Sequence, residues 1–217
     1  MEFLMATILH IEPIAAKSAL ARLGLNEEAL LEAAKHGYLA RSNCTANHPP
    51  LYAPFVAWGE TVRVLREQLT TIGWKRNDEK NYSRIIHPDG YFAIAVATGD
   101  EATGMASGFP CNKSVKGPST IDAIEINRLQ AWLPGMGPDE LQNDPKEGQP
   151  MTWLLLVHHA LNEIRSELSQ PFDIGSNGRI NGWRERILLR TIPLDFDPQE
   201  IIPPSQPDLD VAVRRKA

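Results

Sequence analysis

Residues 98–120 contain the side chains of this sequence that are best suited to bind a charged ligand. The segment follows an apolar run and precedes an expected helix, and its lysines and hydroxyls lie near that helix start. A helix N-terminus attracts anions, so a phosphate or a carboxylate could be held there. The simpler alternative, a solvated loop that contacts a protein or nothing at all, is favoured over an anion site. The candidate binding residues are Asp100, Glu101, Lys113, Ser114, Lys116, Ser119 and Thr120.

Two specific phosphate chemistries fit this segment poorly. The run GFPCNKS resembles a phosphate-binding loop, but Asn112 stands where that loop requires a glycine before the lysine. Asp89, Asp100 and Glu101 flank an expected strand, as carboxylates do in metal-dependent nucleases. A nuclease also needs a second acid and a lysine one residue apart on the next strand, and the run AIAVAT supplies neither. A nucleotide triphosphatase and a nuclease are therefore both disfavoured, and Asp89 is interpreted as a turn residue.

Cysteine and histidine spacing predicts neither a metal centre nor a nucleophile. Cys44 and His48 form an isolated C-x3-H pair, and Cys111, His158 and His159 lie far away in the sequence. A zinc site normally uses closely spaced pairs of ligands, and a catalytic cysteine needs a base beside it. The tryptophans are spread along the chain and do not cluster with basic residues as a base-stacking surface would. We therefore predict no catalytic residues, no metal and no cofactor.

Composition is typical of an ordinary globular protein. The chain has 217 residues, 42% of them hydrophobic, and a formal net charge of -5, so a sizeable core is expected. Proteins that hold nucleic acid by bulk electrostatics usually show an excess of Lys and Arg, which this chain lacks, so a nucleic-acid partner is left open but not favoured. No apolar run suits a membrane span, no signal peptide is recognisable, and two cysteines do not make a disulfide framework. We expect a cytoplasmic protein with free thiols and no membrane partner.

Residues 1–42 predict an N-terminal helical hairpin. Apolar residues recur at helical spacing in two segments, and Asn26 is suited to cap the second helix while Gly37 is suited to end it. The pair resembles a DNA-binding helix-turn-helix only superficially. Its second helix offers Lys35 and His36 near its end, whereas a recognition helix contacts bases with residues near its start. A DNA-binding regulator is therefore an alternative function that is not favoured.

Two further helices are expected later in the chain. The run 58–72 has the clearest amphipathic period, with its large apolar residues, Ile72 among them, on one face. A second helix is expected over 120–133, with Ser119 or Thr120 as its N-cap. Both helices should pack on a sheet.

The other periodic segments predict strands. Residues 81–98 form an antiparallel hairpin around the turn HPDG, and its second strand is apolar on both faces and should lie inside the sheet. Residues 151–170 fit a helix or two strands, and we choose strands because of their bulky β-forming residues. The turn signal GSNG and a further strand follow. Residues 43–192 therefore form an α+β core with a mostly antiparallel sheet, interrupted by a polar linker at 134–150; the acidic, proline-bearing tail 193–217 should lack a fold of its own.

Several runs are similar to proteins carried by mobile genetic elements. NCTANHPP, NYSRIIHPDGYFAIAVATGDEATG, KGPST and GWRERILL resemble uncharacterised cargo proteins of bacterial conjugative plasmids and integrative elements, over most of the chain from residue 43 to about 189. That family has no established activity, so the resemblance implies a genetic setting and carries no site residue. Small acidic cargo proteins of such elements are often stoichiometric inhibitors of host defence systems, anti-CRISPR proteins among them, and this expectation comes from context alone.

The lack of a complete catalytic set in the sequence favours a binding function. The leading hypothesis is a non-enzymatic binding protein that engages a host protein or ribonucleoprotein complex. One alternative is a metal-dependent enzyme that acts on nucleic acid or a phosphate-bearing substrate, using Asp100, Glu101, Lys113 and Lys116 around the loop. The other alternative is the DNA-binding regulator described above.

Overall fold

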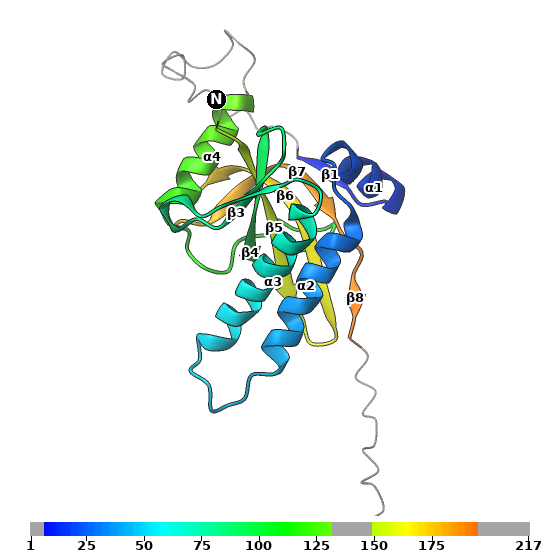
Figure 1. Ribbon diagram of the computed structural model, residues 1–217, viewed down its shortest axis with the longest axis vertical. Coiled ribbons are helices and arrows are strands. Elements are labelled where there is room, and N and C mark those ends of the chain that lie inside the picture. Colours follow the sequence, from blue (N-terminus) through cyan, green and yellow to red (C-terminus); the bar gives the residue numbers. More distant parts are fainter. Residues whose placement is uncertain (1–6, 132–148, 195–217) are drawn as a thin grey trace, which may run out of the picture.

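The computed structural model describes residues 7–131 and 149–194, which form a mixed β-sheet with helices packed against it (Figure 1). The helices are α1 (Pro13–Arg22), α2 (Glu27–Ser42), α3 (Tyr52–Thr70), the 3-10 turn η1 (Glu79–Asn81) and α4 (Pro118–Ala131). The strands are β1 (Ile8–His10), β2 (Lys75–Asn77), β3 (Arg84–Ile86), β4 (Phe92–Thr98), β5 (Met151–His159), β6 (Glu163–Ile174), β7 (Ile180–Leu188) and β8 (Ile192–Pro193).

The sheet is mixed and mostly antiparallel. Its strand order is β1-β7-β6-β5-β4-β3-β2, and β8 pairs with the start of β6. In the described residues only β1 with β7 and β4 with β5 are parallel pairs. The predicted α+β class with a mostly antiparallel sheet is confirmed. The strand prediction for residues 151–170 is also confirmed, because β5 and β6 pair there.

The β3–β4 hairpin and the β6–β7 hairpin form at the predicted turns. His87 and Gly90 close the first turn through a backbone hydrogen bond of 2.9 Å, and Gly90 takes the positive φ of 77° that this turn requires. Gly175 and Gly178 close the second turn in the same way. Strand β4 lies between β3 and β5, as its two apolar faces predict.

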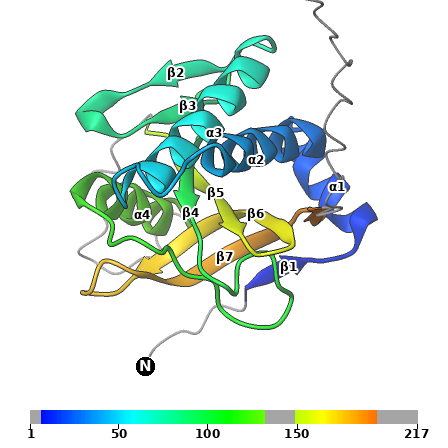
Figure 2. The ribbon, with the colours of Figure 1, turned by 90° about the horizontal axis from the view of Figure 1, so that it is seen from below.

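Helices α2 and α3 lie side by side against one face of the sheet (Figure 2). Their apolar side chains form one core with Ile94, Trp153 and Leu155, residues that point to this face because side-chain direction alternates along a strand. Residues of α1 belong to the same core, so the N-terminal helices and the sheet share it. The two helices approach closely at Gly37, where an added β-carbon would collide with the Thr61 hydroxyl.

Helix α4 packs on the opposite face. Ile124 lies in a second core with Ala95, Leu154 and other alternate residues of β4 and β5. The buried side chain of Asn127 donates to the carbonyl oxygens of Thr152 and Pro171, both at 2.8 Å, and accepts from the Thr152 N–H. Because these groups are buried, the amide both orients α4 and satisfies backbone atoms that water does not reach.

Several expected boundaries were wrong. Helix α3 begins at Tyr52 and ends at Thr70, so Ile72 lies outside it and is 56% exposed. Helix α4 begins at Pro118, which places Ser119 and Thr120 inside its first turn, so neither is the N-cap. Proline is favoured at this position because the first turn has no intrahelical partner for a backbone N–H.

Parts of two predicted segments lie outside the described residues. The predicted linker 134–150 is described only at Gln149 and Pro150, and the predicted tail 193–217 only at Pro193 and Leu194. Among the helices that are described, none is long and apolar enough to cross a membrane.

Candidate functional site

One end of the α2–α3 pair exposes large apolar side chains. The connection between the two helices lies at the lower end of the body in Figure 1, and α3 begins there. Leu51 is 81% exposed, Phe55 66% and Tyr52 43%. The ring of Tyr52 stacks on His48 with centroids 4.7 Å apart. Helices α2 and α3 form an antiparallel helical pair, and we call Leu51, Tyr52 and Phe55 at its end the hairpin tip.

A pocket of about 250 Å³ opens beside the hairpin tip, between the first turns of α3 and the ends of β4 and β5. We call it the α3 pocket. The indole N–H of Trp58 donates to the carbonyl oxygen of Val96 at 3.1 Å, which fixes the ring against β4. The apolar part of the lining includes Leu51, Pro54, Trp58, Val96 and Val157.

Basic side chains line the α3 pocket and acidic ones do not. Arg41 in the last turn of α2 and Lys113 in the loop are both exposed lining residues, and neither makes an ion pair within the described residues. No aspartate or glutamate of the described residues is part of the lining. The pocket is therefore apolar with two free positive charges.

His159 contributes a neutral polar group to the same pocket. Burial, and secondarily the charge of Arg41, lower the pKa of His159 to about 4, so its ring is uncharged at neutral pH. The ring contacts Tyr38 edge to face at 5.7 Å between centroids. Its Nε2 atom is buried and has no hydrogen-bond partner among the described residues.

The parallel pairing of β4 and β5 explains where this pocket forms. The carboxyl ends of both strands, at Thr98 and His159, reach the same edge of the sheet. The loop that leaves β4 returns to it, because Gly99 pairs with Asn112 in a β-bridge and the Lys113 N–H donates to Thr98 at 2.9 Å. This return places Lys113 at the pocket. Crevices beyond the carboxyl ends of parallel strands are common ligand sites.

Asn112 ties the loop to the β6–β7 turn. Its side chain is fully buried, donates to the carbonyl oxygens of Ser114 at 2.6 Å and Gly178 at 3.1 Å, and accepts from the Ile180 N–H at 2.7 Å. Arg179 donates to the backbone carbonyl of Asn112. The residue that is wrong for a phosphate-binding loop therefore has a structural role that glycine could not fill.

A buried ion pair holds the middle of the loop. Glu167 on β6 and Arg186 on β7 join at 2.7 Å, with side-chain exposures of 0% and 5%. Glu167 also accepts from the Gly104 N–H at 2.8 Å, and Arg186 donates to the carbonyl oxygens of Met105 and Gly108. Because both charges are paired and bonded to loop backbone, the loop is anchored to the sheet at these points, although residues 105–109 themselves are exposed.

The predicted binding residues do not form one site. Lys113 and Ser114 line the α3 pocket. Asp100 instead accepts a hydrogen bond from the Ala102 N–H at 3.1 Å and stabilises the turn that follows β4, and Glu101 is exposed. Neither of these acids lines the α3 pocket.

The other three predicted residues lie toward α4. Burial lowers the pKa of Lys116, whose backbone N–H donates to Gly178. Thr120 is only 6% exposed. The Ser119 hydroxyl donates to the Lys80 carbonyl oxygen at 3.4 Å. The structure thus unites only Lys113 and Ser114 with other candidate residues at the α3 pocket.

Ser119 belongs to a second pocket, of about 200 Å³, between η1, β3 and α4. Burial raises the pKa of Tyr82 in this pocket to about 12, and the Arg84 guanidinium lies 5.3 Å from the centre of its ring. Lys80 and Asp122 form an ion pair of 3.7 Å at its rim. Its charges are therefore of both signs and partly paired, unlike those of the α3 pocket.

Sequence reasoning missed most of the α3 pocket. The run LYAPF, directly after two prolines, places large apolar residues at the start of a helix, and this pattern could have indicated an exposed apolar surface. No local pattern marks Arg41 or His159, because the fold gathers them from α2 and β5.

Within residues 7–131 and 149–194, no three His, Cys, Asp or Glu side chains are grouped so that they could hold a metal ion. Cys44 and Cys111 are both unpaired. Comparison of the chain with protein-family models, curated proteins and solved structures gives no match. The functional interpretation therefore rests on the geometry of the site.

Proposed function

We propose that this protein is a non-enzymatic binding protein whose hairpin tip and α3 pocket contact a macromolecular partner. The observation that carries this proposal is the exposure of Leu51, Tyr52 and Phe55 together at one end of the α2–α3 pair. Single exposed apolar residues are normal on protein surfaces, but a contiguous group of them marks an interaction surface. Covering Leu51 or Phe55 would contribute about 1.5–2 kcal/mol each.

The tip is held in place before any partner arrives. Helix α2 packs on α3 so closely at Gly37 that an added β-carbon would lie 2.7 Å from the Ala57 carbonyl oxygen. In the connection between the helices, His48 accepts a hydrogen bond from the Thr45 N–H at 3.0 Å. A surface that is already ordered loses less conformational entropy on binding, so more of the contact energy is available as affinity.

The resemblance to cargo proteins of mobile elements supports a host protein or ribonucleoprotein complex as the partner. We propose a stoichiometric inhibitor of a host defence complex, of the kind represented by anti-CRISPR proteins. Such an inhibitor acts by occupying a surface of its target, so it needs an exposed contact area and no turnover.

The proposal is tested by affinity capture from a bacterial host with quantitative mass spectrometry. Wild-type protein is compared with Phe55→Asp at the tip and with Ile14→Asp on α1. Ile14 is 84% exposed, and α1 lies far from the α2–α3 connection (Figure 1). We expect a partner that wild type and Ile14→Asp retain and that Phe55→Asp loses. Recovery of only the protein itself, or retention of every partner by Phe55→Asp, would contradict the proposal.

A further inference from the structure

We propose that the α3 pocket receives a bulky apolar side chain from an acidic peptide segment of the partner, with Arg41 and Lys113 contacting the carboxylates beside it. This inference rests on the proposed function and specifies the chemistry of the partner. It concerns an interaction surface and requires no reaction.

The size of the pocket indicates a single anchor side chain. Pockets for drug-sized molecules usually measure about 300–1,000 Å³, and the α3 pocket measures about 250 Å³. Protein interfaces are dominated by a few large side chains that fill pockets of this kind. The walls suit such a side chain, because Leu51, Val96 and Trp58 are apolar and the Trp58 ring is fixed by its hydrogen bond to β4.

The charges around the pocket indicate carboxylates. The whole chain is acidic, with a net charge of -5, yet the lining of this pocket has two cations and no acid. Further along α3 the arginines are already neutralised, since Arg63 is paired with Glu60 and Glu67 and Arg66 with Asp78. Arg41 and Lys113 are thus the basic residues of this region that remain available to a ligand.

His159 offers the ligand a further contact. Its Nε2 atom is buried among the lining residues and lacks a hydrogen-bond partner within the described structure. Because this nitrogen is buried, a ligand meets the His159 side chain as a neutral ring, and a neutral ring suits an apolar side chain better than a charged one would.

A peptide fits these observations better than a nucleic acid. A bound nucleic acid strand presents a charge at every nucleotide and calls for a line of cations along its path. Here the two free cations flank one pocket, and the neighbouring arginines on α3 are paired with carboxylates. The apolar part of the lining is mainly aliphatic, and among the described lining residues only Trp58 and His159 carry aromatic rings.

The test measures the binding of short labelled peptides to the full-length protein by fluorescence anisotropy. The probe carries a central phenylalanine flanked on both sides by aspartates. In one matched peptide lysines replace the aspartates, and in another alanine replaces the phenylalanine. We expect the acidic phenylalanine peptide to bind at least about tenfold more tightly than either matched peptide, with affinity that falls as salt is added.

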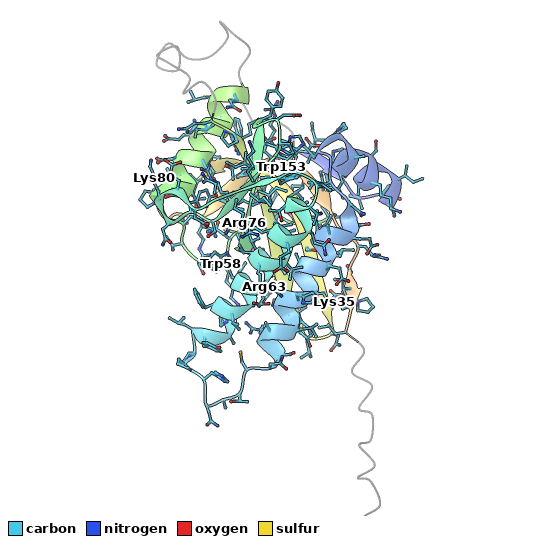
Figure 3. The ribbon with its side chains drawn as sticks, in the orientation of Figure 1. Lys35, Trp58, Arg63, Arg76, Lys80 and Trp153 are labelled. Carbon is cyan, nitrogen blue, oxygen red and sulfur yellow. The ribbon has the colours of Figure 1, made fainter. Side chains whose placement is uncertain are left out.

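Charge-reversal variants locate the binding site. We expect Lys113→Glu and Arg41→Glu each to weaken the binding of the acidic peptide by about tenfold or more, because attraction becomes repulsion at close range. Lys35→Glu is the matched control, since Lys35 and Trp58 lie on opposite sides of the α2–α3 pair (Figure 3); its affinity should stay within about twofold of wild type. All three side chains are exposed, so circular dichroism should show unchanged folding.

Four results would overturn the inference. The first is equal or tighter binding of the lysine peptide, and the second is tighter binding of an oligothymidylate than of the acidic peptide. The third is a dimer in sedimentation analysis that dissociates in Phe55→Asp, which would show that the surface binds a second copy of the chain. The fourth is tighter peptide binding by a full-length variant in which Asp195 and Asp197 are replaced by asparagine, which would give the pocket to the chain's own C-terminal segment.

The inference and the proposed function fail in distinguishable ways. If capture of a cellular partner depends on Phe55 while the peptides show no preference for acid, the function stands and the acidic ligand is wrong. If capture does not depend on Phe55 and no peptide binds, both are wrong.

Discussion

Removing one member of the Glu167–Arg186 pair should destabilise the protein far more than removing both. In Arg186→Met the Glu167 carboxylate stays buried with only the Gly104 N–H and the Ser169 hydroxyl as donors. An uncompensated buried charge of this kind costs about 3–5 kcal/mol. In Glu167→Leu the guanidinium of Arg186 retains only the carbonyl oxygens of Met105 and Gly108, and a cost of similar size is expected.

The double variant Glu167→Leu/Arg186→Met leaves no buried charge. Apolar replacement of a buried ion pair is often close to neutral for stability, so the two single costs should not add, and the coupling should be about 2 kcal/mol or more. The loop should respond differently, because the double variant still lacks every side-chain bond to Gly104, Met105 and Gly108. We therefore expect a nearly normal core and a loop that opens more often.

Urea denaturation measures the free energy of unfolding for the four proteins in this cycle, and hydrogen exchange by mass spectrometry reports on the loop. The Gly104 amide should exchange much faster in the double variant, since its acceptor is gone, while amides of β5 and β6 should be little changed. The reasoning is refuted if either single variant costs less than about 1 kcal/mol, or if the double variant costs the sum of the two.

Two further predictions concern His159 and the helix contact. The folded-state pKa of His159 is about 4, below its ordinary 6.5, so the unfolded chain takes up the proton first as pH falls. The contribution of His159 to the free energy of unfolding should be full above pH 6.5 and fall by up to about 3 kcal/mol as pH drops toward 4. In denaturation curves His159→Phe should remove that part of the pH dependence. Thermal melts should show that Gly37→Ala is destabilising, by about 1–3 kcal/mol, because its β-carbon collides with Thr61. Gly59→Ala on α3 meets no atom within 4 Å and should stabilise by about 0.5–1 kcal/mol. A wild-type stability that does not fall between pH 6.5 and 4, or equal effects of Gly37→Ala and Gly59→Ala on stability, would count against these assignments.

The elements with strong periodicity could be predicted from sequence, and the short ones could not. The hairpin around HPDG and the turn at GSNG carry glycines at positions that need a positive φ, so local chemistry defines them. Strands β1 and β2 have three residues each and no comparable signal, and they exist because β7 and β3 offer edges to pair with. The start of helix α3 at Tyr52 could not be predicted either, because its first turns project past the core and lack the buried apolar face that produces a helical period.

The loop illustrates a different limit of sequence reasoning. Its composition predicts a solvated segment, since it has few apolar residues, but Thr103 and Asn112 are fully buried. The buried Asn112 side chain bonds to the β6–β7 turn and to the start of β7, and the Gly104 N–H bonds to Glu167 of β6. The Thr103 hydroxyl, in contrast, is buried without a hydrogen-bond partner among the described residues. A polar segment can be packed when its hydrogen bonds are satisfied across the fold, and a single-sequence pattern does not reveal such distant partners.

The buried Glu167–Arg186 ion pair is linked to the α3 pocket through this loop. The backbone in the middle of the loop bonds to the buried charges. The part of the loop that returns to β4 is held by Asn112 and Thr98 and places Lys113 at the pocket. An acidic ligand would therefore meet a cation whose backbone is already fixed, which lowers the ordering cost of the contact. Releasing the loop from this ion pair should weaken the charged part of binding and spare the apolar part, because Trp58 belongs to α3 and Leu51 directly precedes that helix, so neither depends on the loop.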